Sequence, residues 1–158
     1  MKQNLFVLAA LLGVSLAAKE DHWAVIVAGS NGFWNYRHQA DACHAYQIVK
    51  KNGIPEDQII MFAFDDVANN SENPFPGKIY NKPNGQDVYE GCNIDYSGSE
   101  VTPDNVLAVL KGDSATMKNK GTGKVLKSTA NSNIFFNFVD HGAPGLIAFP
   151  NGDELYSD

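Results

Sequence analysis

The residues of this chain that are best suited to chemistry are one histidine and one arginine–histidine pair, each placed after an apolar run. His141 can act as a general base near neutral pH, and the guanidinium group of Arg37, beside His38, can hold a carbonyl oxygen or a carboxylate. Three carboxylates follow similar runs, at Asp65, Asp66 and Asp140. Each residue alone is ordinary loop chemistry, so only their convergence at one place would indicate a site.

Several other chemistries are excluded by missing motifs. The chain has no Gly-x-Ser-x-Gly elbow, no Walker loop and no Gly-x-Gly-x-x-Gly turn. No two of its 4 histidines stand four residues apart, and no Cys-x-x-Cys pair occurs, so the spacing does not predict a zinc site. No calcium-loop pattern follows Asp65-Asp66. We therefore expect neither a metal nor a cofactor.

A thiol is the natural partner for a histidine base, because a thiolate forms after only a modest shift of the thiol pKa. The candidates are Cys43 and Cys92. Cys43 falls within a helical pattern, where a small buried residue is the simpler interpretation, and Cys92 lies in a long loop far from any strand end. Spacing alone does not decide whether the two form a disulfide. The residues by themselves give a base without a nucleophile.

The sheet that must position these residues is indicated by three short apolar runs, at residues 23–28, 59–64 and 134–139. None of them alternates cleanly between apolar and polar side chains. Each therefore predicts a strand buried on both faces, as in a parallel sheet. Residues 146–149 predict a fourth strand, and the loop over residues 65–99 is long enough to be functional or wrapped on the surface.

Two helices are predicted between these strands. Residues 39–51 carry apolar side chains at helical spacing, and Asn52-Gly53 ends that helix. The second begins at Pro103 after Thr102, a good N-cap, and Gly112 closes it. Strands and helices in this order predict an α/β sheet with right-handed crossovers. In such a sheet ligands bind beyond the carboxyl ends of the strands, where the residues named above fall.

Composition is typical of one folded domain. The chain has 158 residues, of which 44% are hydrophobic and 19% charged, with a formal net charge of −6 and no basic run. A surface for nucleic acid or for an anionic membrane is therefore not expected.

The first 17 residues predict a secretory signal peptide. Lys2 supplies the positive start, Leu5 to Leu16 form the apolar stretch, and Ala17 ends a cleavage pattern. The stretch is too short to span a membrane, so no stable membrane anchor is expected. In the secretory pathway Asn69, in Asn-Asn-Ser, is a candidate glycosylation site.

Longer stretches of the chain form a specific pattern. The central run is Asn-Tyr-Arg-His-Gln-Ala-Asp-Ala-Cys-His-Ala-Tyr-Gln at residues 35–47, and Asp-His-Gly stands at residues 140–142. Further stretches are residues 23–30, 52–55, 65–66, 73–77, 84–89, 101–103, 123–128 and 149–151. Together they resemble the legumain family of cysteine peptidases, the asparaginyl endopeptidases. The resemblance implies a caspase-like α/β fold with a mostly parallel sheet. It also implies cleavage of peptide bonds after Asn, or after Asp at acidic pH, in lysosomes, vacuoles or outside the cell.

The resemblance also implies roles for individual residues. His141 is then the catalytic histidine, Gly142 offers its backbone N–H to the oxyanion, and Asn35 orients the histidine. Arg37 and His38 form part of the pocket that grips the substrate Asn. The partners implied are peptides and proteins with an exposed Asn.

Two features concern the limits of this resemblance. Asp140 matches an aspartate that in the family forms a succinimide linked to peptide ligation, which implies a transpeptidase side activity. The family's nucleophilic cysteine follows the next core strand, and the chain stops at Asp158 before reaching it. Cys43 matches a non-catalytic family position and Cys92 matches none. We therefore expect residues 18–158 to be the N-terminal part of such a peptidase, without peptidase activity as given.

Two alternatives remain open at this point. The catalytic subunit of the GPI-anchor transamidase shares the fold and the Asn-Tyr-Arg-His stretch, but it tends to carry Gly where this chain has Asp140. The other alternative is a truncated, non-catalytic homologue that binds Asn-containing peptides.

Overall fold

A computed structural model describes residues 21–157 of the chain. Its centre is a parallel sheet of four strands in the order β3-β2-β1-β4. The strands are β1 (Asp21–Ala28), β2 (Ile59–Ala63), β3 (Tyr96–Ser97) and β4 (Ser132–Val139). The three apolar runs of the sequence thus form strands of one parallel sheet, as predicted. The predicted signal peptide, residues 1–17, lies outside the described residues.

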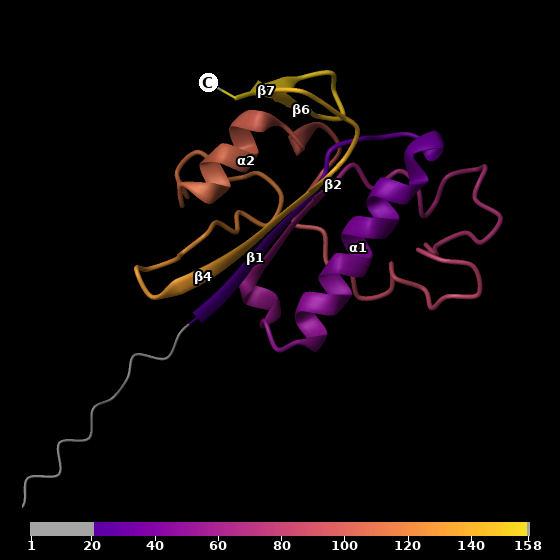
Figure 1. Cartoon of the computed structure of the whole chain (residues 1–158), viewed down its shortest axis with the longest axis horizontal. Helices are drawn as coiled ribbons and strands as arrows, with labels where there is room; N and C mark the ends of the chain where they lie inside the picture. The colour runs from indigo at the N-terminus through magenta and orange to yellow at the C-terminus, as the bar shows by residue number, and fades with distance from the viewer. Residues whose placement is uncertain (1–20, 158) are drawn as a thin grey trace, which may run out of the picture.

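The two long helices, α1 (Tyr36–Lys51) and α2 (Pro103–Leu110), cover opposite faces of this sheet (Figure 1). One face of β1, including Ile26, packs against α1 in the first core cluster. The other face, including Val25, packs against α2 in the second cluster. Because successive side chains of a strand point to opposite faces, the continuous apolar run of β1 fills both clusters.

The ends of both helices follow from local sequence. The hydroxyl oxygen of Thr102 accepts a hydrogen bond from the Asn105 backbone N–H at 3.3 Å, as expected of an N-cap. Gly53 follows α1 with φ 96°, and its N–H donates to the Lys50 carbonyl at 3.0 Å. Gly112 follows α2 with φ 70°, and a Cβ there would lie 2.8 Å from the Leu126 carbonyl oxygen. Helix α1 begins at Tyr36, three residues before the predicted start.

A second sheet is small and antiparallel. It contains β5 (Gly142–Ala143), β6 (Leu146–Ala148) and β7 (Glu154–Tyr156), in that order. It lies near α2, at the end of the molecule where β4 finishes (Figure 1). The predicted strand at residues 146–149 therefore forms, but in this sheet. The fourth parallel strand is β3, from the long loop, where its two residues were too few to give a pattern.

The prediction that residues 134–139 are buried on both faces is wrong. Ile134, Phe135 and Phe136 are 47%, 47% and 44% exposed. Among the described residues β4 is an edge strand, with β1 on one side only, and this position leaves its first half open to solvent. Only its end is covered, where Phe138 packs edge-on against Phe149 with ring centroids 5.3 Å apart.

Three short 3-10 helices complete the elements: η1 (Phe33–Asn35), η2 (Glu56–Gln58) and η3 (Gly98–Glu100). The long loop after β2 is fastened at its end by Asp95. Its buried carboxylate accepts hydrogen bonds from the Met61 backbone N–H and the Thr122 hydroxyl, and Lys124 Nζ lies 2.9 Å from it. The loop is therefore wrapped on the surface and held, as its length suggested.

Tyr96 gives this fold a measurable alkaline limit. Its ring is buried and stacks on Phe62 at 4.5 Å, and burial raises the pKa of its hydroxyl to about 12. In the unfolded chain the pKa of the same hydroxyl is near its ordinary value of 10.0. Between these values the unfolded state loses the proton first, so the free energy of unfolding falls as pH rises from about 10 to about 12.

We expect Tyr96→Phe to flatten this alkaline fall by at most about 3 kcal/mol, because phenylalanine has no proton to lose. Urea unfolding at pH 8, 10 and 11.5 measures the free energy of unfolding of each protein. Tyr80→Phe is the control, since it also removes a phenol hydroxyl, from a half-buried tyrosine on the long loop. An equally steep fall in Tyr96→Phe and in the unchanged chain would contradict the prediction.

Candidate active site

The candidate site lies where β1 and β4 end. These strands are parallel neighbours, and the Gly29 N–H donates to the Val139 carbonyl at 2.9 Å, so the segments that follow them start side by side. After β1 the chain passes through η1 into the first turn of α1, which carries Arg37 and His38. After β4 come Asp140 and His141. In the structure these residues therefore lie together at the carboxyl edge of the sheet, as predicted.

His141 is paired with Asn35, 106 residues earlier in the chain. Asn35 Oδ1 lies 2.8 Å from His141 Nε2, and Asn35 Nδ2 donates to the Asn31 carbonyl at 2.8 Å. Because the amide NH₂ is used by Asn31, Oδ1 is left to accept, which places the imidazole proton on Nε2. The lone pair of the neutral ring is then on Nδ1, which is the atom able to take a proton.

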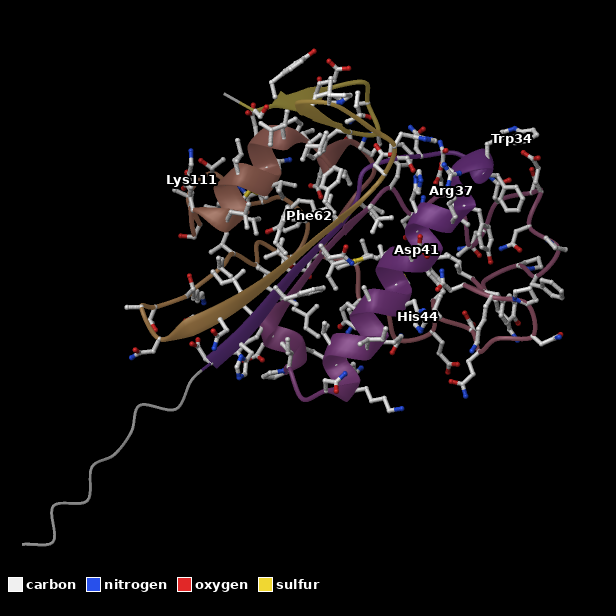
Figure 2. All side chains as sticks on the ribbon, viewed as in Figure 1. Trp34, Arg37, Asp41, His44, Phe62 and Lys111 are labelled. Atoms are coloured by element: carbon white, nitrogen blue, oxygen red, sulfur yellow. A yellow bond between two sulfur atoms is a disulfide. The ribbon has the colours of Figure 1, made fainter. Side chains whose placement is uncertain are left out.

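Arg37 stands beside that lone pair. Its NH2 group lies 3.4 Å from His141 Nδ1 and 3.5 Å from Nε2, and its NH1 group reaches the Trp34 carbonyl at 3.4 Å. A guanidinium group only donates, so its contact with the ring can only be to Nδ1. Both Arg37 and Trp34 are exposed and lie at the same end of α1 (Figure 2). The guanidinium group is thus held at the entrance of the site, with donors to spare.

His38 is the buried member of the site. Its ring is 4% exposed, stands edge-on to His141 with centroids 4.9 Å apart, and places Nδ1 2.6 Å from Ser30 Oγ. Burial lowers the pKa of His38 below its ordinary value, and the charge of Arg37 adds to this. The ring is therefore neutral at neutral pH, although Asp140 Oδ1 lies 3.3 Å from Nδ1.

The two acidic residues after β2 support the site from outside it. Asp66 accepts hydrogen bonds from the Gly32 backbone N–H and from Gln39 Nε2, both at 2.7 Å. It therefore joins the loop after β1 to α1. Asp65 accepts a hydrogen bond from the Tyr89 hydroxyl at 2.8 Å and contacts none of the histidines. The sequence placed both at the correct edge, but their bonds are those of scaffold residues.

Two other predicted residues, Gly142 and Asn69, lie at exposed positions. Gly142 follows His141 at the start of β5 and is exposed, with open space around it. Asn69 is exposed on the long loop, as a glycan acceptor must be. Ser30 and Asn31, whose contacts hold His38 and Asn35, were not among the predicted site residues. Their only signal was their position directly after a strand.

Cys43 and Cys92 are joined in a disulfide between α1 and the long loop. These are the only cysteines of the 158-residue sequence, and neither is a free thiol. The question that spacing left open is therefore answered. His141 therefore has no free thiol available to it from either cysteine of this sequence.

The fold and the site together define an α/β protein of the caspase-like class, with a histidine–asparagine pair at the carboxyl ends of two neighbouring parallel strands. Residues 22–158 match the model of the Peptidase C13 family. The chain belongs to the peptidase C13 family, whose members include asparaginyl endopeptidases.

The relatives of this chain are similar over most of its length. It is 62% identical to legumain of Rattus norvegicus over 132 residues, which are 84% of this chain and 30% of that protein. It is 55% identical to the vacuolar-processing enzyme delta-isozyme of Arabidopsis thaliana over 139 residues, or 88% of this chain and 30% of the relative. Hemoglobinase of Schistosoma japonicum is 55% identical over 131 residues, 83% of this chain and 30% of the relative. The chain spans about a third of the length of the curated relatives it matches.

Within residues 21–157, neither helix combines the length and the apolar character needed to cross a membrane.

Proposed function

We propose that this chain supplies the histidine side of the active site of a cysteine endopeptidase that cleaves after Asn, and after Asp at acidic pH. The observation that carries the proposal is the His141–Asn35 hydrogen bond at 2.8 Å, which leaves Nδ1 as the base, in a chain of the C13 family. The nucleophilic cysteine then comes from the remainder of the full-length protein, because both cysteines of this segment are bonded to each other.

The proposed reaction follows the usual course for a thiol peptidase. His141 Nδ1 takes the thiol proton, and the thiolate sulfur bonds to the carbonyl carbon of the substrate Asn. The C–N bond breaks as the leaving amine receives the proton from His141, and water then hydrolyses the thioester. If an amine takes the place of this water, the product is a new peptide bond, which is the ligase side activity. The Gly142 backbone N–H is assigned to the oxyanion and Asp140 to the succinimide.

Arg37 and His38 are assigned to the pocket for the substrate side chain. The exposed guanidinium group of Arg37 has unused donors that suit the amide oxygen of Asn. The buried His38 ring behind it supplies a rigid wall, fixed by Ser30. Protonation of an Asp substrate removes its charge and makes it resemble Asn, which accounts for cleavage after Asp at acidic pH.

The proposed route is the secretory pathway, ending in a lysosome, a vacuole or the extracellular space. The relatives include vacuolar-processing enzymes, the amino terminus has the signal-peptide pattern, and Asn69 is exposed for glycosylation. The partners are protein substrates with an accessible Asn.

The test uses the complete protein, read onward from the codon for Asp158. After acid activation it is assayed on matched peptides that carry Asn, Asp or Gln at one position, with rat legumain as the positive control. Cleavage after Asn supports the proposal. An intact protein that leaves all three peptides uncut while the control cleaves them would refute it, and retained binding of the Asn peptide would then favour the non-catalytic homologue.

Asn35→Ala in the complete protein is expected to lower kcat/KM about 10- to 100-fold. The variant loses one hydrogen bond of roughly 1.5–3 kcal/mol to the imidazolium formed during the reaction. Asn93→Ala, a remote exposed amide, is the control. Equal kcat/KM values for Asn35→Ala and the unchanged enzyme would show that this bond does not orient the base.

A further inference from the structure

Three metal-binding side chains meet at the end of β1 and β4. One ring nitrogen each of His38 and His141 and one carboxylate oxygen of Asp140 lie within 4.8 Å of one another. They come from two segments about a hundred residues apart, brought together by the pairing of β1 with β4. Spacing along the chain, from which no zinc site was expected, does not reveal such a group.

Asp140 is the unusual member of the group. Its side chain is 3% exposed, and Oδ1 receives no hydrogen bond from any residue of the described range 21–157. Buried carboxylate oxygens without a donor are rare, because the lost hydration is not replaced. The nearby atom is Nδ1 of His38, at 3.3 Å, whose ring also contacts the Ser30 hydroxyl. This oxygen is therefore available to a cation.

We propose that His38, Asp140 and His141 form a binding site for a divalent transition-metal ion, with Zn²⁺ as the best-fitting ion. Two imidazoles and one carboxylate are a donor set that zinc uses when it keeps a fourth position open for water. Imidazole ligands also favour zinc over Ca²⁺ and Mg²⁺, which take oxygen ligands.

The distances are compatible with this assignment. Ligands about 2.0–2.1 Å from a tetrahedral zinc stand roughly 3.3 Å apart, which is the separation of His38 Nδ1 from Asp140 Oδ1. Coordination by Nδ1 exchanges the hydrogen bond with Ser30 for a bond to the metal. His141 is exposed, so its ring can turn by the small amount needed to close the remaining gap.

Metal binding would have a direct consequence for the proposed peptidase. A zinc ion on His141 engages the base and holds the ring against His38, so the histidine no longer accepts a thiol proton. Zinc would thus act as a reversible inhibitor at this site. This consequence rests on the proposed function, whereas the binding of zinc does not.

The test titrates the 158-residue chain with Zn²⁺ alone at pH 7.5, by isothermal titration calorimetry and by thermal unfolding. One zinc per chain is expected, with a rise in Tm because the ion binds the folded state. His141→Ala and Asp140→Asn are each expected to weaken binding at least about tenfold. His22→Ala, which removes an exposed histidine at the far end of β1, is expected to bind as the unchanged chain does.

Two results would overturn the proposal: no saturable zinc binding, or equal binding by the unchanged chain and His141→Ala. His141 is exposed, so this variant keeps the comparison valid even if Asp140→Asn does not fold. Binding is measured without substrate. Zinc binding by a chain whose complete protein cleaves no peptide would leave the metal site standing and refute only the proposed peptidase.

Discussion

His141→Ala in the complete protein is expected to lower kcat/KM for an Asn peptide by about 10⁴-fold, the upper range for loss of a general acid–base residue. Both halves of the proposed reaction pass through Nδ1 of this ring, which takes the thiol proton and later gives it to the leaving amine. Its geometry is set by Asn35 at 2.8 Å on the opposite nitrogen. His141→Ala removes the proposed base, whereas Asn35→Ala leaves the imidazole in place and removes only one hydrogen bond to it. We therefore expect a smaller fall in kcat/KM for Asn35→Ala.

This prediction is open to a clean control, because His141 is exposed and contributes little to the core. Circular dichroism and thermal unfolding of His141→Ala should match those of the unchanged protein. His22→Ala, which also removes an exposed histidine, should keep full activity. A His141→Ala protein with more than about a tenth of normal kcat/KM would assign the base to another residue.

The sheet and helices were predictable wherever one short segment contained enough information. The run at 23–28 contributes to both core clusters, so it had to be apolar throughout, and β1 was recognised from that. Thr102 marks the start of α2 and Gly53 the end of α1, each through a hydrogen bond to a residue within four positions. Such contacts are local, so they can be predicted from a single sequence.

Contacts between distant segments were not predictable in this way. The two residues of β3 form a strand only because Phe62 and Ala63 of β2 are beside them. The exposure of Phe136 depends on its place in the sheet order and not on its own neighbours in sequence. The position of Asp66 after a strand predicts a site residue, but in the structure its carboxylate binds Gly32 and Gln39 instead.

In the site, too, local features could be predicted from the sequence and contacts between distant segments could not. That His141 follows a strand could be inferred from residue types, and with it the edge at which ligands bind. Its pairing with Asn35 came only from family resemblance, because a lone asparagine before a helix most often signals a cap. In the structure the Asn35 side chain makes no cap bond and is directed to the histidine instead. The position of Asn35 before a helix therefore did not reveal its hydrogen bond to His141.

Removal of the Cys43–Cys92 disulfide is expected to destabilise the chain by about 2–5 kcal/mol and to lower Tm by roughly 4–20 °C. The bridge closes a loop with a sequence separation of 49 residues, which includes much of the segment that has little regular structure of its own. Both cysteines are buried in the first core cluster, Cys43 on α1 and Cys92 on the long loop. Without the bridge the unfolded chain gains conformational freedom, and the loop loses its covalent attachment to the helix.

The measurement compares thermal unfolding of the unchanged chain and of Cys43→Ala/Cys92→Ala, each with and without dithiothreitol. The reductant should lower Tm of the unchanged chain only, because the double variant has no bond to reduce. Identical melting in all four samples would show that the bridge contributes nothing. The same samples address the chemistry: without reductant, iodoacetamide should label neither cysteine, since a thiol held in a disulfide attacks no electrophile. Each sulfur is bonded to the other, so neither can serve as the nucleophile in the proposed reaction of His141.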